Sequence, residues 1–281
     1  MTKVATSEVR AAPSEAWDAI AEAYDAHVLP HESGVGRDTL RLAGLEPGHR
    51  FLDVAAGPGG LALAAARLGA EVVAIDWAPR MIERLEARAR EAGLSDVEGR
   101  VMDCHALEFD DDTFDVTGSR FGVMLVPEQP RALREMVRVT RRGGRVLVIA
   151  FNAPDRFEAL QFFLGAIKAV VPEFEGLPAD APPLEFQVSD PAVLHRRLDD
   201  AGLRHVTVDI DHHERVDVRS GQELWDWCLG SNPIPGMLIA DLGDEQKASV
   251  RGKLDEMVAA RSDERGVATL TAALNIGIGT K

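Results

Sequence analysis

A short apolar run that leads into a cluster of glycines constrains the fold of this chain most. Residues 51–60 read FLDVAAGPGG, and an alanine-rich stretch continues to residue 68. The branched and aromatic residues of 51–55 predict a strand, and the run over 60–68 predicts a helix. Glycines let a backbone take positive φ and approach a ligand closely, and open α/β sheets bind ligands where their strands end. The loop is therefore a predicted ligand site.

A regular alternation of strands and helices follows this loop. Strands are predicted over 71–75, 97–102, 114–117, 145–150, 204–218 (bent at His212-His213) and 267–278, and helices over 79–92, 130–141, 190–202 and 244–261. Two helical stretches, 14–28 and 37–44, precede the first strand. Such alternation indicates an α/β fold, with a mainly parallel sheet and helices on both faces. For 281 residues we expect one domain over 1–281.

The formal net charge of −15 narrows the expected partners. A surface of this charge repels phosphate backbones and anionic lipids, so we expect neither nucleic acid nor a membrane surface as partner. No apolar run approaches the roughly 20 residues that cross a bilayer, and residues 1–12 lack the apolar core of a signal peptide. Cys104 and Cys228 form no disulfide framework and no zinc spacing. These features predict a cytoplasmic protein.

Three aspartates accompany the glycine loop. Asp53 lies inside the first strand, Asp76 ends the second, and Asp103 follows the third. A carboxylate at Asp76 suits the hydroxyls of a ribose, but GPGGLA over 57–62 also matches the dinucleotide fingerprint. The glycines alone leave a nicotinamide cofactor and another adenosine cofactor open. Asp53 favours the latter, because a carboxylate there repels a diphosphate and attracts a cationic amino-acid group.

The segment 53–59 resembles the glycine motif of class I S-adenosylmethionine-dependent methyltransferases. The resemblance continues through Asp76, Asp103, residues 114–116 and the turn 142–145. Residues 119–124 (SRFGVM) are similar to the ubiquinone/menaquinone-biosynthesis type (methyltransferase type 11) and its natural-product relatives. The resemblance covers 14–150 strongly and 190–281 in layout only. Ala55 stands where the family often has glycine, which is tolerated if its φ stays negative.

The resemblance implies a Rossmann-like sheet of seven strands in the order 3-2-1-4-5-7-6, with the last strand antiparallel and an inserted helical cap. It implies an N-terminal helical lid over 14–44 and a core over 51–150 that binds S-adenosylmethionine. Residues 152–189 and 220–243 are then cap insertions that enclose the acceptor. The residues assigned to the cofactor are Tyr24, Asp53, Ala55, Gly57, Gly59, Asp76, Trp77, Met81, Asp103, Cys104 and Arg120.

The implied reaction is methyl transfer to oxygen or carbon of a small acceptor, apolar and aromatic or isoprenoid, because the inserted segments are strongly apolar. His31, His27 and Arg120 are the candidates for catalytic groups, since imidazole titrates near neutrality and Arg120 ends the fourth strand beside the sulfonium. His105 is expected at the surface.

No metal site is expected. The run DIDHHE over 209–214 offers ligands, but neighbouring strand residues point to opposite faces. Two rival functions stay open, an NAD(P)-dependent oxidoreductase and a non-catalytic protein that binds S-adenosylmethionine. A homo-oligomer is also left open.

Overall fold

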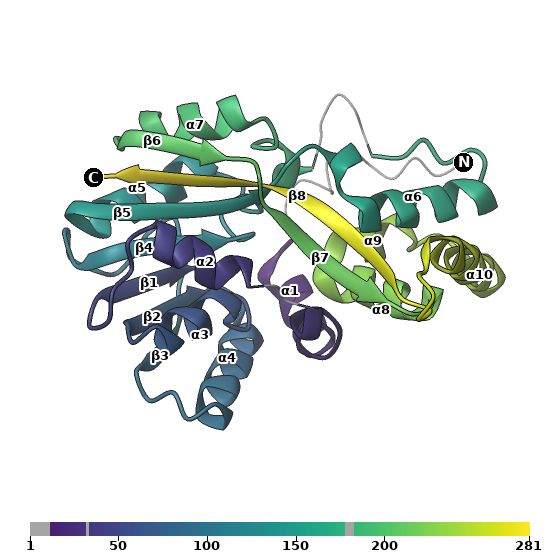
Figure 1. The fold of residues 1–281 in the computed structure, drawn as a ribbon, viewed down its shortest axis with the longest axis horizontal. Coiled ribbons are helices and arrows are strands. Elements are labelled where there is room, and N and C mark those ends of the chain that lie inside the picture. The colour runs from purple at the N-terminus through teal and green to yellow at the C-terminus, as the bar shows by residue number, and fades with distance from the viewer. Residues whose placement is uncertain (1–11, 32–33, 178–182) are drawn as a thin grey trace.

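A sheet of eight strands forms the centre of the computed structural model, which describes residues 12–31, 34–177 and 183–281 (Figure 1). The strands are β1 (Arg50–Val54), β2 (Glu71–Asp76), β3 (Val97–Val101), β4 (Phe114–Arg120), β5 (Thr140–Phe151), β6 (Arg204–Asp209), β7 (His213–Val218) and β8 (Ala268–Thr280). Their order is β3-β2-β1-β4-β5-β8-β6, and β7 pairs with β8. Strands β1 to β5 pair in parallel, and β8 is antiparallel to its partners. The predicted Rossmann-like fold is confirmed.

The strand predicted over 204–218 is two strands, so the expected number of seven is wrong. The carboxylate of Asp209 accepts a hydrogen bond from the backbone N–H of Asp211 at 2.9 Å. This Asx turn interrupts the ladder between β6 and β7. At the interruption the carbonyl of His212 accepts from the backbone N–H of Leu274 at 2.9 Å, so both strands stay on β8.

Helices cover both faces of the sheet, as predicted. On one face lie α2 (Val35–Leu42), α3 (Gly60–Arg67) and α4 (Pro79–Glu91), which bury Leu40, Leu61 and Leu85 in a shared cluster. On the other lie α5 (Gln129–Val139) and α7 (Pro191–Asp200), which bury Met136 and Leu198. We call these five helices, together with β1 to β6 and residues 274–280 of β8, the core lobe.

Strand β8 leaves the core lobe and carries a second group of helices (Figure 1). Its residues 274–280 pair with β5 and β6, whereas residues 268–273 pair with β7. Around this two-stranded ribbon lie α6 (Glu158–Val170), α8 (Gly221–Ser231), α9 (Pro233–Leu238) and α10 (Asp244–Arg261). Phe163, Trp225 and Leu254 are buried in one hydrophobic cluster of these helices. We call the ribbon and its helices the cap lobe.

The N-terminal segment touches both lobes. Helix α1 (Ser14–Ala23) continues into the π-helical turn η2 (Tyr24–Val28) and the 3-10 turn η3 (Leu29–His31), where one helix over 14–28 was predicted. Helix α1 contacts α4 of the core lobe and α8 of the cap lobe. Val28 belongs to the hydrophobic cluster of the cap lobe. The segment therefore closes one side of the space between the lobes.

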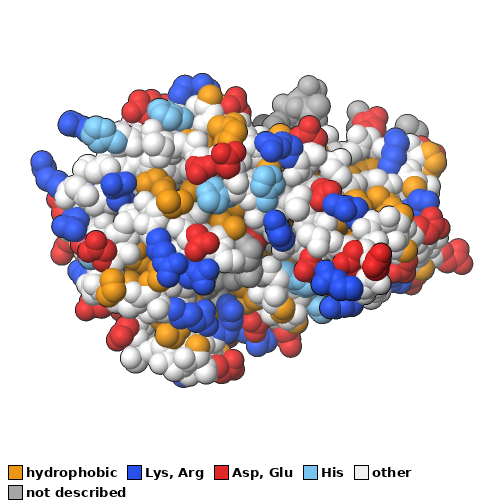
Figure 2. Space-filling model, in the orientation of Figure 1, with side chains coloured by type: hydrophobic (Ala, Val, Ile, Leu, Met, Phe, Trp, Pro, Cys, Tyr) orange, Lys and Arg blue, Asp and Glu red, His pale blue; other side chains and the backbone are white. Residues whose placement is uncertain are grey.

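The surface carries charged side chains of both signs. Figure 2 shows acidic and basic groups interspersed over the face in view, with hydrophobic side chains scattered between them. Within the described ranges, every helix is too short or too polar to cross a bilayer.

Candidate active site

The loop between β1 and α3 has the sharp backbone that its glycines predict. Gly57 has a φ of 54° and Gly59 a φ of 91°. A Cβ on Gly59 would lie 2.8 Å from the Cγ of Leu85, so the loop sits close against α4. Ala55 also has a positive φ, 53°, which overturns the expectation of a negative value. A Cβ on Gly122 would lie 2.6 Å from both the Cβ and the carbonyl oxygen of Ala55, so the segment after β4 packs closely against this residue.

Asp76, at the end of β2, holds the loop from the side. Its carboxylate accepts backbone N–H groups from Gly57 at 2.8 Å and from Ala78 at 2.9 Å. Burial raises the pKa of Asp76 to about 6, although these hydrogen bonds favour the ionised form. Around the position of a Cβ on Gly57 there is no atom within 4 Å, so a ligand can lie against this backbone.

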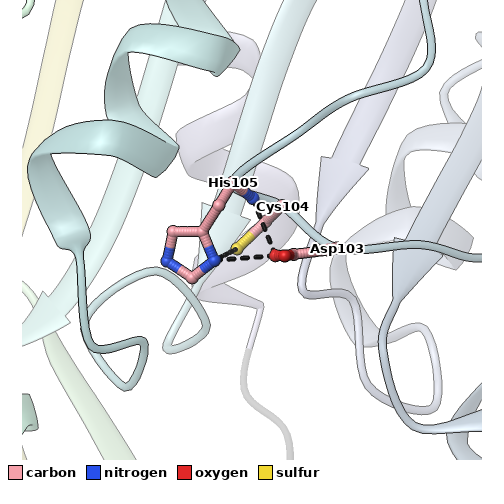
Figure 3. Close-up of side chains that lie close together, drawn as sticks. All are labelled: Asp103, Cys104 and His105. Carbon is pink, nitrogen blue, oxygen red and sulfur yellow. Dashed lines mark hydrogen bonds and ion pairs between the residues drawn. The ribbon is translucent and has the colours of Figure 1, made fainter.

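Residues after β2 and β3 form the next wall of the crevice. Trp77 is 38% exposed and Met81 is buried, and both line the cavity beside Asp103 and Cys104. Figure 3 shows that Asp103, Cys104 and His105 form a compact group. The Asp103 carboxylate accepts from the backbone N–H of His105 at 2.9 Å and lies 2.7 Å from its Nδ1. Burial raises the pKa of Asp103, but these hydrogen bonds outweigh it and hold the pKa below its ordinary value.

The expectation that His105 is a surface residue is wrong. Its side chain is only 12% exposed and lines the cavity. The ring Nδ1 lies 4.0 Å from the Cys104 sulfur. Burial, together with the charges of Asp103 and Asp76, raises the pKa of Cys104 to about 12, so the thiol stays protonated at neutral pH.

The same group is also the one cluster of potential metal ligands found within the described residues. The ligand atoms of Asp103, Cys104 and His105 lie within 4.8 Å of one another. Nδ1 of His105 already lies 2.7 Å from the Asp103 carboxylate, so these two potential ligands engage each other. The absence of a metal stays a prediction.

Arg120 ends β4 and forms a buried ion pair between the lobes. Its Nη2 lies 2.9 Å from Oε2 of Glu214 on β7, and the two side chains are 9% and 10% exposed. The guanidinium carbon also lies 5.0 Å from the ring centroid of Phe121. Arg120, Asp53 and Tyr24 line a small recess beside the glycine loop, where the resemblance places the methionine part of the cofactor. Asp53 is 1% exposed.

Aromatic side chains connect this crevice to the cap lobe. Phe121 stacks on Phe151 with centroids 4.4 Å apart, and Phe151 stacks on Phe157 at 4.5 Å. Phe157 meets Trp227 edge to face at 6.1 Å. All four line one cavity of about 1770 Å³, part of it open to solvent, which also reaches Gly57 and Asp76. Its acidic end and its aromatic end belong to the same space.

The two candidate histidines differ in position. His31 lines the cavity, and burial lowers its pKa against the opposing charges of Glu223 and Asp217. It is therefore neutral at pH 7. His27 is exposed and is not one of the described residues that line the cavity.

Sequence reasoning missed Glu185, a buried acid in the same cavity. Glu185 is 7% exposed and lies in the 3-10 turn η5 (Leu184–Phe186). Its Oε2 accepts from Nδ2 of Asn232 at 2.8 Å. Burial raises the pKa of Glu185 to about 7, and the bond from Asn232 opposes the rise. A single charge inside the apolar stretch 184–186 was the signal in the sequence.

The core lobe has the architecture of class I methyltransferases, with a glycine crevice at the carboxyl edge of the sheet and an antiparallel strand between the fifth and sixth. The chain belongs to the ubiE/COQ5 methyltransferase family, whose model matches residues 14–185, more than half of the 281 residues. The predicted family is thereby confirmed.

Solved structures share this fold. A putative methyltransferase of Bacillus halodurans superposes with a TM-score of 0.56 at 20% identity, over 89% of this chain and 99% of that one. Phosphoethanolamine N-methyltransferase 2 of Haemonchus contortus, solved with S-adenosyl-L-methionine, gives a TM-score of 0.51 at 15% identity, over 88% of this chain and 52% of that one. At these identities the likeness concerns the fold.

Curated proteins match part of the chain at higher identity. An uncharacterized protein of Mycobacterium tuberculosis is 39% identical over 149 residues, 53% of this chain and 52% of its own length. Demethylmenaquinone methyltransferase of Clavibacter sepedonicus is 38% identical over 148 residues, 50% of this chain and 58% of its own length. The chain thus spans about half the length of the curated relatives that it matches.

Proposed function

We propose that this chain transfers the methyl group of S-adenosylmethionine to oxygen or carbon of a small apolar acceptor with aromatic or isoprenoid character. The observation that carries the proposal is that one cavity joins the acid-lined glycine crevice to an aromatic chamber. The acidic end suits a cationic cofactor, and the apolar end suits an apolar acceptor. The relatives named demethylmenaquinone methyltransferases support the same type of reaction.

The crevice fits S-adenosylmethionine better than a dinucleotide. The open space at Gly57 lets a ligand approach the backbone, and each oxygen of Asp76 keeps a lone pair for a ribose hydroxyl. Asp53 is a buried carboxylate beside the glycine loop. A diphosphate there would meet like charge, whereas an α-ammonium or sulfonium is attracted. This charge disfavours the oxidoreductase alternative.

The protein contributes alignment and a dry site. When bound, the cofactor supplies an electrophilic methyl group attached to a positively charged sulfur. Phe121 and Phe157 give the acceptor flat apolar walls, which orient it and exclude water. The ion pair of Arg120 and Glu214 joins β4 to the cap lobe and so fixes the distance between these walls and the crevice.

A pair of glycine variants tests the cofactor site. Gly57→Ala and Gly143→Ala both place a methyl group at positive φ with no atom within 4 Å, so each loses about 1–2 kcal/mol of stability. Only the first fills the proposed site. By calorimetry we expect Gly57→Ala to weaken binding of S-adenosylhomocysteine at least tenfold and Gly143→Ala to leave it unchanged.

Transfer itself is measured with methyl-labelled S-adenosylmethionine and a panel of phenols, naphthols and hydroquinones. Label in the extracted product supports the proposal. Binding of NADH in place of S-adenosylhomocysteine would overturn the cofactor assignment. Tight binding without transfer to any acceptor would favour the non-catalytic alternative.

A further inference from the structure

The turn that carries Glu185 is fixed over the end of β4. Gln129, the first residue of α5, is 2% exposed, and its Nε2 donates to the carbonyl of Leu184 at 3.0 Å and to that of Met124 at 2.6 Å. Its Oε1 accepts from Nη1 of Arg197 on α7. Met124 and Glu185 both line the cavity. The acid is therefore held at the edge of the sheet where open α/β folds bind their substrates.

The hydrogen bonds of Asn232 orient the carboxyl group of Glu185. Oδ1 of Asn232 accepts from the backbone N–H of Ile234 at 2.9 Å, so its Nδ2 must face Glu185. The 2.8 Å bond from Nδ2 holds Oε2. Within the described ranges, Oε1 receives no hydrogen bond, which leaves this oxygen to accept one from a bound molecule.

Building on the proposed function, we propose that Glu185 is the catalytic base and that the acceptor is a ring bearing a weakly acidic hydroxyl, a phenol or a hydroquinone. The O–H bond of the acceptor breaks and its proton goes to Oε1 of Glu185. The electron pair left on the acceptor forms the new bond to the methyl carbon, at the oxygen or at the adjacent ring carbon. The C–S bond breaks with its pair on sulfur, which becomes a neutral thioether.

Transfer at carbon requires a second proton loss. The ring carbon then releases its own proton to water, and the hydroxyl is restored when water returns a proton to the oxygen. In both cases one methyl cation equivalent replaces one proton, so no oxidant or reductant is needed.

The proton affinity of Glu185 suits this role. Its pKa of about 7 comes from burial, opposed by Asn232, and a base with a pKa near the working pH is the most effective. Arg197 on α7 already meets Gln129 and Gln187. The other charged or titratable groups that face the cavity include His31, Asp76, Asp103, His105, Arg120 and Glu214. Burial lowers the pKa of His31 and so weakens it as a base.

A matched pair of acceptors tests the base directly. The hydroxyl of 1-naphthol is protonated at pH 8, whereas 4-nitro-1-naphthol is already ionised and needs no base. With 1-naphthol we expect Glu185→Gln to lower kcat roughly 100-fold or more, within the range for general base catalysis. With the nitro compound the loss is less than about tenfold. Wild-type kcat rises to a plateau above pH 7, and Glu185→Gln lacks this rise.

Glu158→Gln is the control variant. Glu158 lies on α6 of the cap lobe, accepts from the backbone N–H of Thr271 at 2.7 Å, and is not one of the described residues that line the cavity. It should retain wild-type kcat on both naphthols. Glu185→Asp keeps an acid and should keep the rise with pH. Calorimetry should show S-adenosylhomocysteine binding to every variant with unchanged affinity.

Three outcomes overturn the assignment of Glu185, and a fourth contradicts the proposed function on which it rests. Equal losses on both naphthols in Glu185→Gln mean a structural role, and retained kcat on 1-naphthol means no role. A wild-type enzyme that methylates no member of the acceptor panel contradicts the proposed function itself, and the base falls with it. If Glu185→Gln fails to bind S-adenosylhomocysteine, the wild-type pH profile and Glu185→Asp provide the test instead. A wild-type kcat that does not change with pH contradicts the assignment of Glu185 as the base.

Discussion

Asp76 and Glu185 are buried carboxyl groups that face the same cavity, and their neighbours give them different proton affinities. Asp76 accepts N–H groups from Gly57 and Ala78, which limit the effect of burial, so its pKa rises only to about 6. Glu185 has the single donor Asn232, and its pKa rises to about 7. Asp76, which we propose to hold ribose hydroxyls in its ionised form, thus has more hydrogen-bond donors than Glu185, the proposed base.

Substitution of Asn232 should change the pKa of Glu185 while the carboxyl group itself stays in place. In Asn232→Ser the hydroxyl can still cap α9, but the amide donor to Glu185 is lost. Because that donor stabilises the ionised form, the pKa of Glu185 rises by about one unit. The base is then protonated over a wider range, so the acid limb of kcat against pH moves to higher pH. Measured kcat from pH 5.5 to 9 checks this, with S-adenosylhomocysteine affinity as the control. A limb that stays in place or moves to lower pH contradicts it.

Some of the site residues that the sequence predicted follow from strand ends. Asp76, Trp77 and Asp103 line the cavity because each lies at or just after the carboxyl end of a parallel strand. Glu185 obeys no such rule. Its surroundings come from Asn232, 47 residues further along, and from the turn held by Gln129, and no local pattern brings these together.

At the scale of elements, the long strand β8 explains why the cap lobe is rigidly joined to the core lobe. One end of it lies between β5 and β6, and the other end forms the ribbon with β7. The alternation of apolar residues over 204–218 predicted extended structure there, but not the break. Aspartate occurs both at strand ends and in Asx turns, so the residue type at 209 does not predict which of the two forms. The hydrogen bond that Asp209 accepts from the N–H of Asp211 shows that it forms the turn.

The ion pair of Arg120 on β4 and Glu214 on β7 is a second connection between the two lobes. Glu214→Gln leaves the buried guanidinium of Arg120 without the carboxylate at 2.9 Å, so we expect a loss of about 3–5 kcal/mol in the free energy of unfolding. Asp217→Asn is the matched control on the same strand, because Asp217 is exposed and its bond with Thr269 survives as an amide. Its effect should stay within about 0.5 kcal/mol. Urea unfolding of both variants measures the difference.

The double variant Arg120→Leu/Glu214→Leu separates charge burial from packing. Since neither charge is then buried, most of the lost stability should return. If Glu214→Gln costs no more than Asp217→Asn, the pair does not hold the lobes together.

At the scale of the whole molecule, each lobe lines a different part of the cavity. Gly57 and Asp76 belong to the core lobe. Trp227 lies on α8 of the cap lobe, and Phe157 lies just before α6, in the segment that leads from β5 to that helix. A cofactor bound in the crevice would touch mainly the core lobe, and an acceptor in the aromatic chamber would touch both. Acceptor binding should therefore reduce local opening of the cap lobe in a way that cofactor binding alone does not.

Hydrogen exchange read by mass spectrometry can distinguish the two ligands. With S-adenosylhomocysteine alone, protection should increase over 55–60, 76–81 and 103–106, because these backbone segments border the crevice. Adding 1-naphthol should extend protection to α6 and α8, whose side chains Phe163 and Trp227 line the chamber. The reverse order matters as well: without cofactor, 1-naphthol should protect α6 and α8 only weakly, since the crevice beside it stays filled with water. Protection by 1-naphthol that is confined to the core lobe would place the acceptor outside the chamber. This result would contradict the proposal that the acceptor contacts the cap lobe.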